Sequence, residues 1–168
     1  RNKDYIIEGL GIELNDDSAE AEINLQNVKI RSMKLFAKKM SFLPRQLRHP
    51  LVFIELLFKI LIKTANLKID VVHCHDTLVL PIGLLIKKIK KAKLIYDAHE
   101  LESNKNGQTK FMSWGTFFIE KKCWKYVDLL ISVSDSILEW YNKHLGNKKN
   151  ILLLNAPEMP KTKTINHL

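Results

Sequence analysis

The sequence predicts an α/β domain with a Rossmann-like, doubly wound parallel sheet and helices on both faces. Two observations support this fold class. In the second half of the chain, short apolar runs alternate with segments of helical periodicity, which is typical of parallel strands joined by helices. The apolar runs are also continuous, as expected for strands that are covered on both faces.

The first 67 residues give a less regular pattern. The expected elements are, in order, a strand at 5–7, a polar acidic loop at 15–24, a strand at 27–31, a basic turn at 45–49 and a helix at 51–67. The second strand is predicted from its alternation of apolar and polar side chains. Pro44 and Pro50 bracket the basic turn, and apolar residues cover most of the surface of the helix that follows.

From residue 69 the pattern becomes regular. The expected elements are a strand at 69–74, a helix at 78–89, a strand at 93–96, a polar loop at 104–109, a helix at 117–126, a strand at 129–133, a helix at 136–146 and a strand at 151–154. Pro81 falls in the first turn of its helix, where proline is tolerated. Ser136 and Glu139 match a capping box, and Gly146 is a natural C-cap.

Composition is that of one ordinary globular domain, with 168 residues, 46% hydrophobic and 27% charged. Two cysteines, Cys74 and Cys123, do not make a disulfide framework, so a reducing, cytoplasmic compartment is expected. The first residues lack the apolar segment of a cleaved signal. The longest apolar region is interrupted by Glu55 and Lys59 and is too short to span a membrane. The net charge of +9 leaves nucleic acid, anionic membranes and acidic substrates open as partners.

Polar residues follow the four expected parallel strands of the regular half. Open α/β sheets bind ligands at the carboxyl ends of their strands, so these clusters are the candidate site. They are His75-Asp76-Thr77, Asp97-Ala98-His99-Glu100, Ser134-Asp135-Ser136 and Asn155-Ala156-Pro157-Glu158.

Several of these residues also have a purely structural interpretation. Asp76, Thr77, Ser134 and Ser136 are of the types that cap helix N-termini, and capping is favoured over substrate contact for them. His99 lies in neither a cap position nor a helical stripe, and its imidazole can exchange a proton near neutral pH. A catalytic role for His99 and a structural one both remain open on these grounds.

His73-Cys74-His75-Asp76 also raises the hypothesis of a metal site. In a strand, His73 and His75 point to one face and Cys74 to the other, and no second cluster with zinc-like spacing follows. No metal is therefore expected. Cys74 lies inside a strand, where an inert buried thiol is more common than a nucleophile.

Four segments resemble the N-terminal domain of GT-B glycosyltransferases of the family-4 type. They are 70–76 (DVVHCHD), 92–100 (AKLIYDAHE), 120–134 (EKKCWKYVDLLISVS) and 153–158 (LLNAPE). Their order matches the family's, and the resemblance runs from about residue 69 to 158. It implies that residues 1–158 form the acceptor-side domain, that 159–168 begin a linker or loose tail, and that a C-terminal donor-binding domain lies outside this sequence.

The resemblance implies retaining transfer of a hexosyl-type sugar from a nucleotide-sugar to a lipid-linked or polysaccharide acceptor, without a metal or other cofactor. His99 matches the family histidine that faces the transferred sugar, where it would hydrogen-bond the sugar and stabilise charge. His75 and Asp76 match acceptor-side positions, Glu100 adjoins His99, and Ser134 lies on the same rim. Glu120 matches a recurrent helix position whose role we expect to be structural.

Two departures from the family pattern matter. The family opens with a strand, a glycine-rich loop and a helix, whereas the first strand here resembles the family's second one. The paired glutamates of the donor domain, eight positions apart, have no equivalent in this sequence. We therefore expect this chain alone to be inactive.

Basic residues surround the apolar helix expected at 51–67. Lys38, Lys39, Arg45 and Arg48 are candidates for docking on an anionic membrane surface, the inner face of a membrane, although charged helix faces usually just face water. The alternative function is a non-catalytic basic α/β module that binds an anionic membrane or polymer. Nucleic-acid binding is not expected, because no aromatics interleave the lysines and no recognition motif occurs. Another sugar-nucleotide enzyme, such as an epimerase, is a further alternative.

Overall fold

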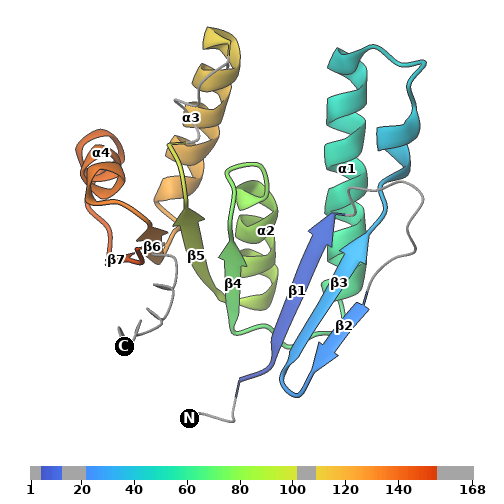
Figure 1. The fold of residues 1–168 in the computed structure, drawn as a ribbon, viewed down its shortest axis with the longest axis horizontal. Helices are drawn as coiled ribbons and strands as arrows, with labels where there is room; N and C mark the ends of the chain where they lie inside the picture. The colour runs from blue at the N-terminus through green and yellow to red at the C-terminus, as the bar shows by residue number, and fades with distance from the viewer. Residues whose placement is uncertain (1–4, 13–21, 102–108, 155–168) are drawn as a thin grey trace, which may run out of the picture. The chain divides into compact units, whose positions relative to one another are not determined.

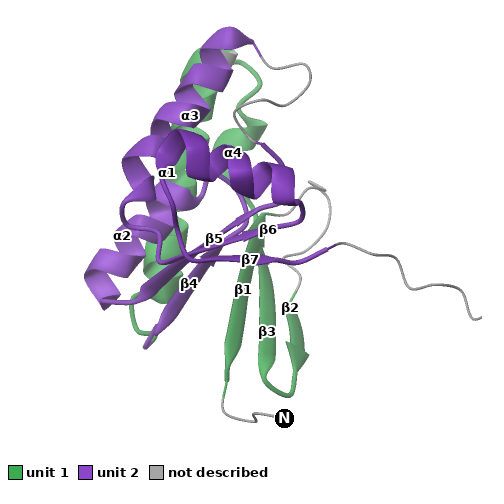
Figure 2. Cartoon of the chain, turned by 90° about the vertical axis from the view of Figure 1, so that its left-hand side faces the viewer, with its two compact units in different colours: residues 1–67 green, residues 68–168 purple. Residues whose placement is uncertain are grey.

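The computed structural model describes residues 5–12, 22–101 and 109–154 and forms two compact units, residues 1–67 and 68–168 (Figures 1 and 2). The expected tail at 159–168, the Asn155–Glu158 cluster and most of the polar loop at 104–109 lie outside the described residues. Each unit is described by itself.

The first unit contains a mixed three-stranded sheet and one long helix. Its elements are β1 (Ile7–Ile12), β2 (Glu22–Leu25), β3 (Val28–Met33), the 3-10 helix η1 (Phe36–Lys39) and α1 (Arg45–Thr64). The strand order is β1-β3-β2, with β1 parallel and β2 antiparallel to β3. Glu55 of α1 accepts hydrogen bonds from the backbone N–H groups of Phe36 and Ala37, both at 2.7 Å, and thereby fastens η1 to α1.

Two expectations for this unit were wrong. The predicted basic turn at 45–49 is the first part of α1, which runs through Pro50. Pro50 removes one hydrogen bond near the N-terminal end of a 20-residue helix, and the remaining turns hold the helix. The first strand, expected at 5–7, instead runs from Ile7 to Ile12 and includes Gly9 and Gly11.

The second unit is a regular βα unit repeated along the chain. Its elements are β4 (Val71–Cys74), α2 (Leu80–Lys90), β5 (Lys93–Ala98), α3 (Lys110–Trp124), β6 (Leu129–Ser132), α4 (Asp135–Leu145) and β7 (Asn150–Leu152). The strands are ordered β4-β5-β6-β7 and every neighbouring pair is parallel, which confirms the predicted parallel sheet. The carboxyl ends of all four strands therefore lie at one edge.

The strands of this sheet follow one another in chain order, and right-handed crossovers then place all the connecting helices on one face. The core agrees: Leu80 of α2, Tyr96 of β5, Trp124 of α3 and Tyr141 of α4 belong to one buried cluster. Within this unit the three helices thus cover one face, which is one half of the predicted doubly wound arrangement.

All three helices of this unit begin at other residues than predicted, and α2 begins at Leu80 instead of residue 78. α3 begins at Lys110, seven residues before the expected start, with the Thr109 hydroxyl accepting from the Met112 N–H at 3.3 Å. The predicted Ser136–Glu139 capping box is wrong, because α4 begins at Asp135 with Ser134 at its N-cap. Pro81 in the first turn of α2 and Gly146 as the C-cap of α4, with φ of 94°, are confirmed.

Gly83 lets α2 pack closely on the sheet. A Cβ at this position would lie 2.2 Å from the Cys74 Sγ and 3.1 Å from Leu94 Cδ1, so Gly83→Ala is expected to destabilise the fold by about 1–3 kcal/mol. Urea denaturation measures this effect, and Gly115→Ala on α3 is the matched control because nothing lies within 4 Å of its added Cβ. Combining Gly83→Ala with Cys74→Ala should restore part of the loss. Equal stabilities for the two glycine variants would contradict this close packing.

Candidate active site

The candidate site forms on the face of the second unit's sheet opposite the helices. In the register of β4 and β5, His73 pairs with Ile95 and Cys74 with Tyr96. Because side chains alternate between faces, Cys74 and Tyr96 point into the helix-covered core, while His73, Asp97 and their alternate neighbours point the other way. His75 and His99 continue this alternation just past the ends of the two strands.

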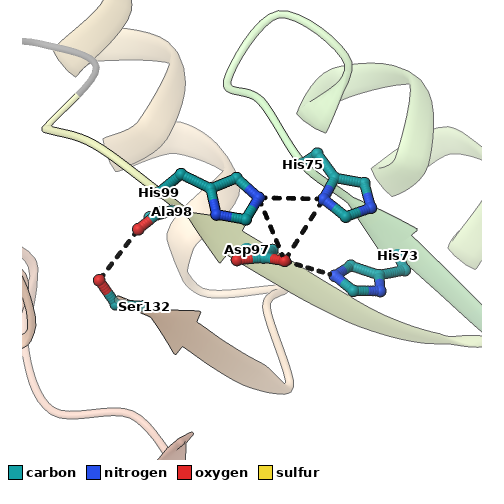
Figure 3. Close-up of polar contacts among 6 residues, drawn as sticks. All are labelled: His73, His75, Asp97, Ala98, His99 and Ser132. Carbon is teal, nitrogen blue, oxygen red and sulfur yellow. Dashed lines mark hydrogen bonds and ion pairs between the residues drawn. The ribbon is translucent and has the colours of Figure 1, made fainter. Parts of the chain in front are cut away.

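Three histidines surround one buried carboxyl group (Figure 3). Asp97 is 5% exposed, and its Oδ2 lies 3.1 Å from His73 Nε2, 3.3 Å from His75 Nδ1 and 3.5 Å from His99 Nε2. The His75 Nδ1 and His99 Nε2 atoms are 3.2 Å apart. We call His73, His75, Asp97 and His99 the histidine cluster.

The histidine rings of the cluster also stack on one another. The ring centroids of His73 and His75 are 4.4 Å apart, and those of His75 and His99 are 5.5 Å apart, with nearly parallel planes. His75 and His99 are the more exposed members and present their rings to solvent, whereas Asp97 lies beneath them. The exposed rings are thus available to a ligand, and the buried carboxyl group fixes their orientation.

Burial lowers the pKa of His73, and the neighbouring His75 adds to this effect, while Asp97 opposes it. The neutral form of His73 is therefore favoured near neutral pH, with Nε2–H as a donor to Asp97. The second carboxyl oxygen of Asp97, Oδ1, is buried and has no hydrogen-bond partner among the described residues. Asp97 thus holds the rings through one oxygen and keeps acceptor capacity on the other.

Ser132 fixes the backbone beside the cluster. It is fully buried at the end of β6 and donates from its Oγ to the Ala98 carbonyl oxygen at 2.9 Å (Figure 3). This bond ties β6 to β5 one residue before His99. Ser132 was not among the predicted site residues.

The structure brings His75 and His99 together and adds His73 and Asp97 to them. His73 belonged to the metal hypothesis and Asp97 to the strand-end cluster at 97–100, but neither was expected to have a role in sugar transfer. The signal for both was present in the sequence, since each lies two residues before a predicted histidine on the same strand face. Asp76 and Glu100 are exposed and follow the cluster in sequence. Ser134 lies at the same strand edge, where its hydroxyl hydrogen-bonds that of Ser136 at 2.6 Å.

Capping by Asp76 or Thr77 was expected and is wrong for α2. The N-cap of α2 is Val79, which has no side-chain cap. The Thr77 hydroxyl is buried and instead lies 2.8 Å from the Tyr96 hydroxyl and donates to Glu120 Oε1 at 3.0 Å. The Thr77 side chain therefore points into the core, where Tyr96 and Glu120 are its hydrogen-bond partners.

Glu120 accepts hydrogen bonds from the hydroxyl groups of three other segments of the second unit. It is fully buried on α3, and its Oε1 accepts from Tyr141 at 2.6 Å, from Tyr96 at 2.8 Å and from Thr77. Burial raises the pKa of Tyr96 and of Tyr141 far above the usual value, so both remain hydroxyl donors. The position of Glu120 in the core supports its expected structural role.

Cys74 behaves as predicted for an inert thiol. It is buried on the helix-covered side, away from the histidine cluster, and burial raises its pKa to about 12. Cys123 is also a buried free cysteine with a pKa raised by burial. Because the thiolate is the reactive form, neither cysteine is suited to nucleophilic chemistry.

Comparison with known proteins defines the class. The model for Glycosyltransferase Family 4 matches residues 16–154, and the chain therefore belongs to this family, as the sequence resemblance indicated. No curated protein sequence matches the chain.

Two solved structures of sucrose-phosphate synthase from Thermosynechococcus elongatus share the fold. One matches with a TM-score of 0.64 and 12% identity over 90% of this chain and 76% of that chain. The other matches with a TM-score of 0.65 and 12% identity over 88% of this chain, but this chain spans only 37% of its length. These matches confirm the expected GT-B-type, Rossmann-like architecture.

Proposed function

We propose that this chain is the acceptor-side part of a retaining glycosyltransferase that moves a sugar from a nucleotide-sugar to a glycan or lipid-linked acceptor. The observation that carries the proposal is the histidine cluster at the carboxyl ends of β4 and β5, where α/β sheets bind ligands. Membership of glycosyltransferase family 4 supports the same reaction class.

In this proposal His99 is the catalytic residue. Its half-exposed ring would hydrogen-bond the transferred sugar and stabilise charge as the bond to the nucleotide breaks. Asp97 and His75 position the ring, since both contact its Nε2 atom and leave Nδ1 for the substrate. Asp76, Glu100 and Ser134 would contact the acceptor or the sugar from the same strand edge. The transfer itself would need no metal.

The donor nucleotide would bind to a second domain, outside the 168 residues. The sequence has no pair of glutamates eight positions apart, the spacing expected of the donor site. We therefore propose that the intact protein turns over and that this chain alone does not.

The proposal is tested by measuring donor hydrolysis and sugar transfer with a panel of nucleotide-sugars. The intact protein should consume at least one donor, and the isolated chain should consume none. Robust transfer by the isolated chain would refute the division of labour between two domains. If the intact protein consumes no donor while still binding glycan or lipid, the non-catalytic binding module is the better interpretation.

A specific surface favours membrane docking as a second function. Leu47, Leu51, Ile54, Phe58 and Ile62 recur at helical spacing along α1, and all five are exposed. An exposed apolar stripe of this length on a 20-residue helix is unusual for a solvated surface and typical of helices that lie in a membrane interface. No helix among the described residues is long and apolar enough to cross a membrane.

Basic residues accompany the stripe. Arg48 lies beside it on α1, Arg45 is the first residue of the helix, and Lys38 and Lys39 are exposed on η1 of the same unit. We propose that these residues attract anionic headgroups while the stripe enters the interface. Such an arrangement would place a cytoplasmic transferase on the inner membrane face, beside a lipid-linked acceptor.

Flotation with vesicles tests this docking. We expect binding to vesicles with anionic lipid, weaker binding to neutral vesicles, and at least about a tenfold loss for Phe58→Glu, since a charge on the apolar face is costly in the interface. Ile89→Glu, at an exposed apolar position of α2, is the matched control and should bind normally. Equal binding to both vesicle types, or none, would end the idea.

A further inference from the structure

The histidine cluster has the composition of a metal site. His73 Nε2, His75 Nδ1 and one Asp97 oxygen lie within 4.8 Å of one another on two adjacent strands. We propose that His73, His75 and Asp97 bind a divalent transition-metal ion of the Zn²⁺ or Co²⁺ type, and that the bound ion inhibits sugar transfer. The inhibitory half of this inference rests on the proposed transferase function, and the binding half does not.

The distances between these atoms are similar to those between ligands of one metal ion. With bonds of about 2.0–2.1 Å, two ligand atoms of tetrahedral zinc lie about 3.3–3.4 Å apart. Asp97 Oδ2 is 3.1 Å from His73 Nε2 and 3.3 Å from His75 Nδ1, and the ligand atoms of the two histidines lie within 4.8 Å of each other. Binding of an ion would require the histidine rings to turn so that their lone pairs face it.

The site is built on a rigid frame. The ligands come from paired parallel strands, and the register sets His73 and His75 on the face of Asp97. Asp97 is only 5% exposed, and its Oδ1 lacks a hydrogen-bond partner among the described residues. A buried carboxyl oxygen without a partner is costly, and a cation bound to Oδ2 would offset part of that cost through its attraction to the whole carboxylate.

The chemical types of the three metal ligands indicate which ion the site would bind. Two imidazoles and one carboxylate suit Zn²⁺, Co²⁺ or Ni²⁺, whereas Mg²⁺ and Ca²⁺ prefer oxygen ligands. Cys74 is excluded because it points into the helix-covered core. His99 Nε2 lies 3.2 Å from His75 Nδ1 and 3.5 Å from Asp97 Oδ2, so His99 or a water molecule would be the fourth ligand of a tetrahedral ion.

Binding would remove the groups that position His99. Asp97 and His75 both contact the His99 ring, and an ion that takes their ligand atoms leaves His99 without them or draws it into coordination. In either state the ring is no longer free for the sugar. The ion is therefore expected to act as an inhibitor and not as a cofactor of the transfer.

Calorimetric titration of the protein with Zn²⁺ tests the binding, and the visible absorption of the Co²⁺ form reports tetrahedral coordination. We expect one ion per chain, with affinity lowered at least about tenfold in His73→Ala and in Asp97→Asn. His144→Ala is the matched control, because His144 lies on α4 outside the histidine cluster, where it contacts the ring and the carbonyl oxygen of Trp140. Circular dichroism checks that each variant is folded.

Absence of binding, or equal affinity in His73→Ala and wild type, would overturn the site. Inhibition is measured separately as donor turnover by the intact protein at increasing Zn²⁺, with reversal by a chelator. Turnover that Zn²⁺ does not affect, despite stoichiometric binding, would overturn the inhibitory role alone. An intact protein that binds Zn²⁺ but consumes no donor would refute the transferase proposal and leave the metal site standing.

Discussion

His99→Ala is expected to lower the turnover of the intact protein by about 100-fold or more, the usual cost of removing one preorganised polar group that stabilises a transition state. The reason is geometric. The His99 ring is held through Nε2 by His75 at 3.2 Å and by Asp97 at 3.5 Å, and it is half-exposed, so that a substrate can reach it. The loss should fall on kcat more than on KM, because the interaction strengthens as charge develops.

Two variants make this result specific. His144→Ala removes an exposed histidine of the same unit outside the cluster and should leave the rate unchanged. Asp97→Asn keeps the shape of the buried side chain but weakens its hold on three rings, so a smaller loss of about tenfold is expected. Initial rates of sugar transfer at saturating donor provide the measurement. A His99→Ala enzyme with normal kcat would remove His99 from the catalytic role.

The regular half of the fold was predictable because its signals are local and agree with one another. Apolar runs, Pro81 and Gly146 each point to the same βα arrangement, and the parallel sheet follows from their order. The first half was less predictable. Pro50 resembles a helix breaker in sequence, yet α1 runs through it because one lost bond is small beside the packing and hydrogen bonding of a 20-residue helix.

The candidate site was predictable in outline only. The rule that strand ends carry ligands identified His75 and His99, which the structure brings within hydrogen-bond distance. It could not identify Asp97 as the central group, because that depends on the register between β4 and β5, which no local pattern specifies. For the same reason Thr77 was predicted as a cap, whereas a partner 43 residues away, Glu120, turns its hydroxyl into the core.

Glu120→Ala is expected to cost about 3–5 kcal/mol of folding stability, the largest effect of any single core substitution proposed for this chain. The change leaves a cavity and removes the acceptor for the Thr77, Tyr96 and Tyr141 hydroxyls, and each unsatisfied buried donor costs about 1–3 kcal/mol. The 2.8 Å contact between Thr77 and Tyr96 recovers part of that cost, so the sum is less than three full penalties.

Urea denaturation followed by circular dichroism measures the loss. Glu120→Gln retains an acceptor oxygen of the same reach and should lose only about 1 kcal/mol, which separates the hydrogen bonds from the volume of the side chain. Glu139→Ala on the exposed surface of α4 is the matched control and should change stability by less than about 0.5 kcal/mol.

The four partners belong to four different segments: Thr77 precedes α2, Tyr96 lies on β5, Glu120 on α3 and Tyr141 on α4. Removing their common acceptor should therefore loosen the whole second unit and not one helix. Tyr96 immediately precedes Asp97, so the same variant is expected to disturb the histidine cluster from beneath, with transfer activity falling before the protein unfolds. A Glu120→Ala protein with wild-type stability would mean that the hydroxyls find other acceptors and that the network does not hold the unit together.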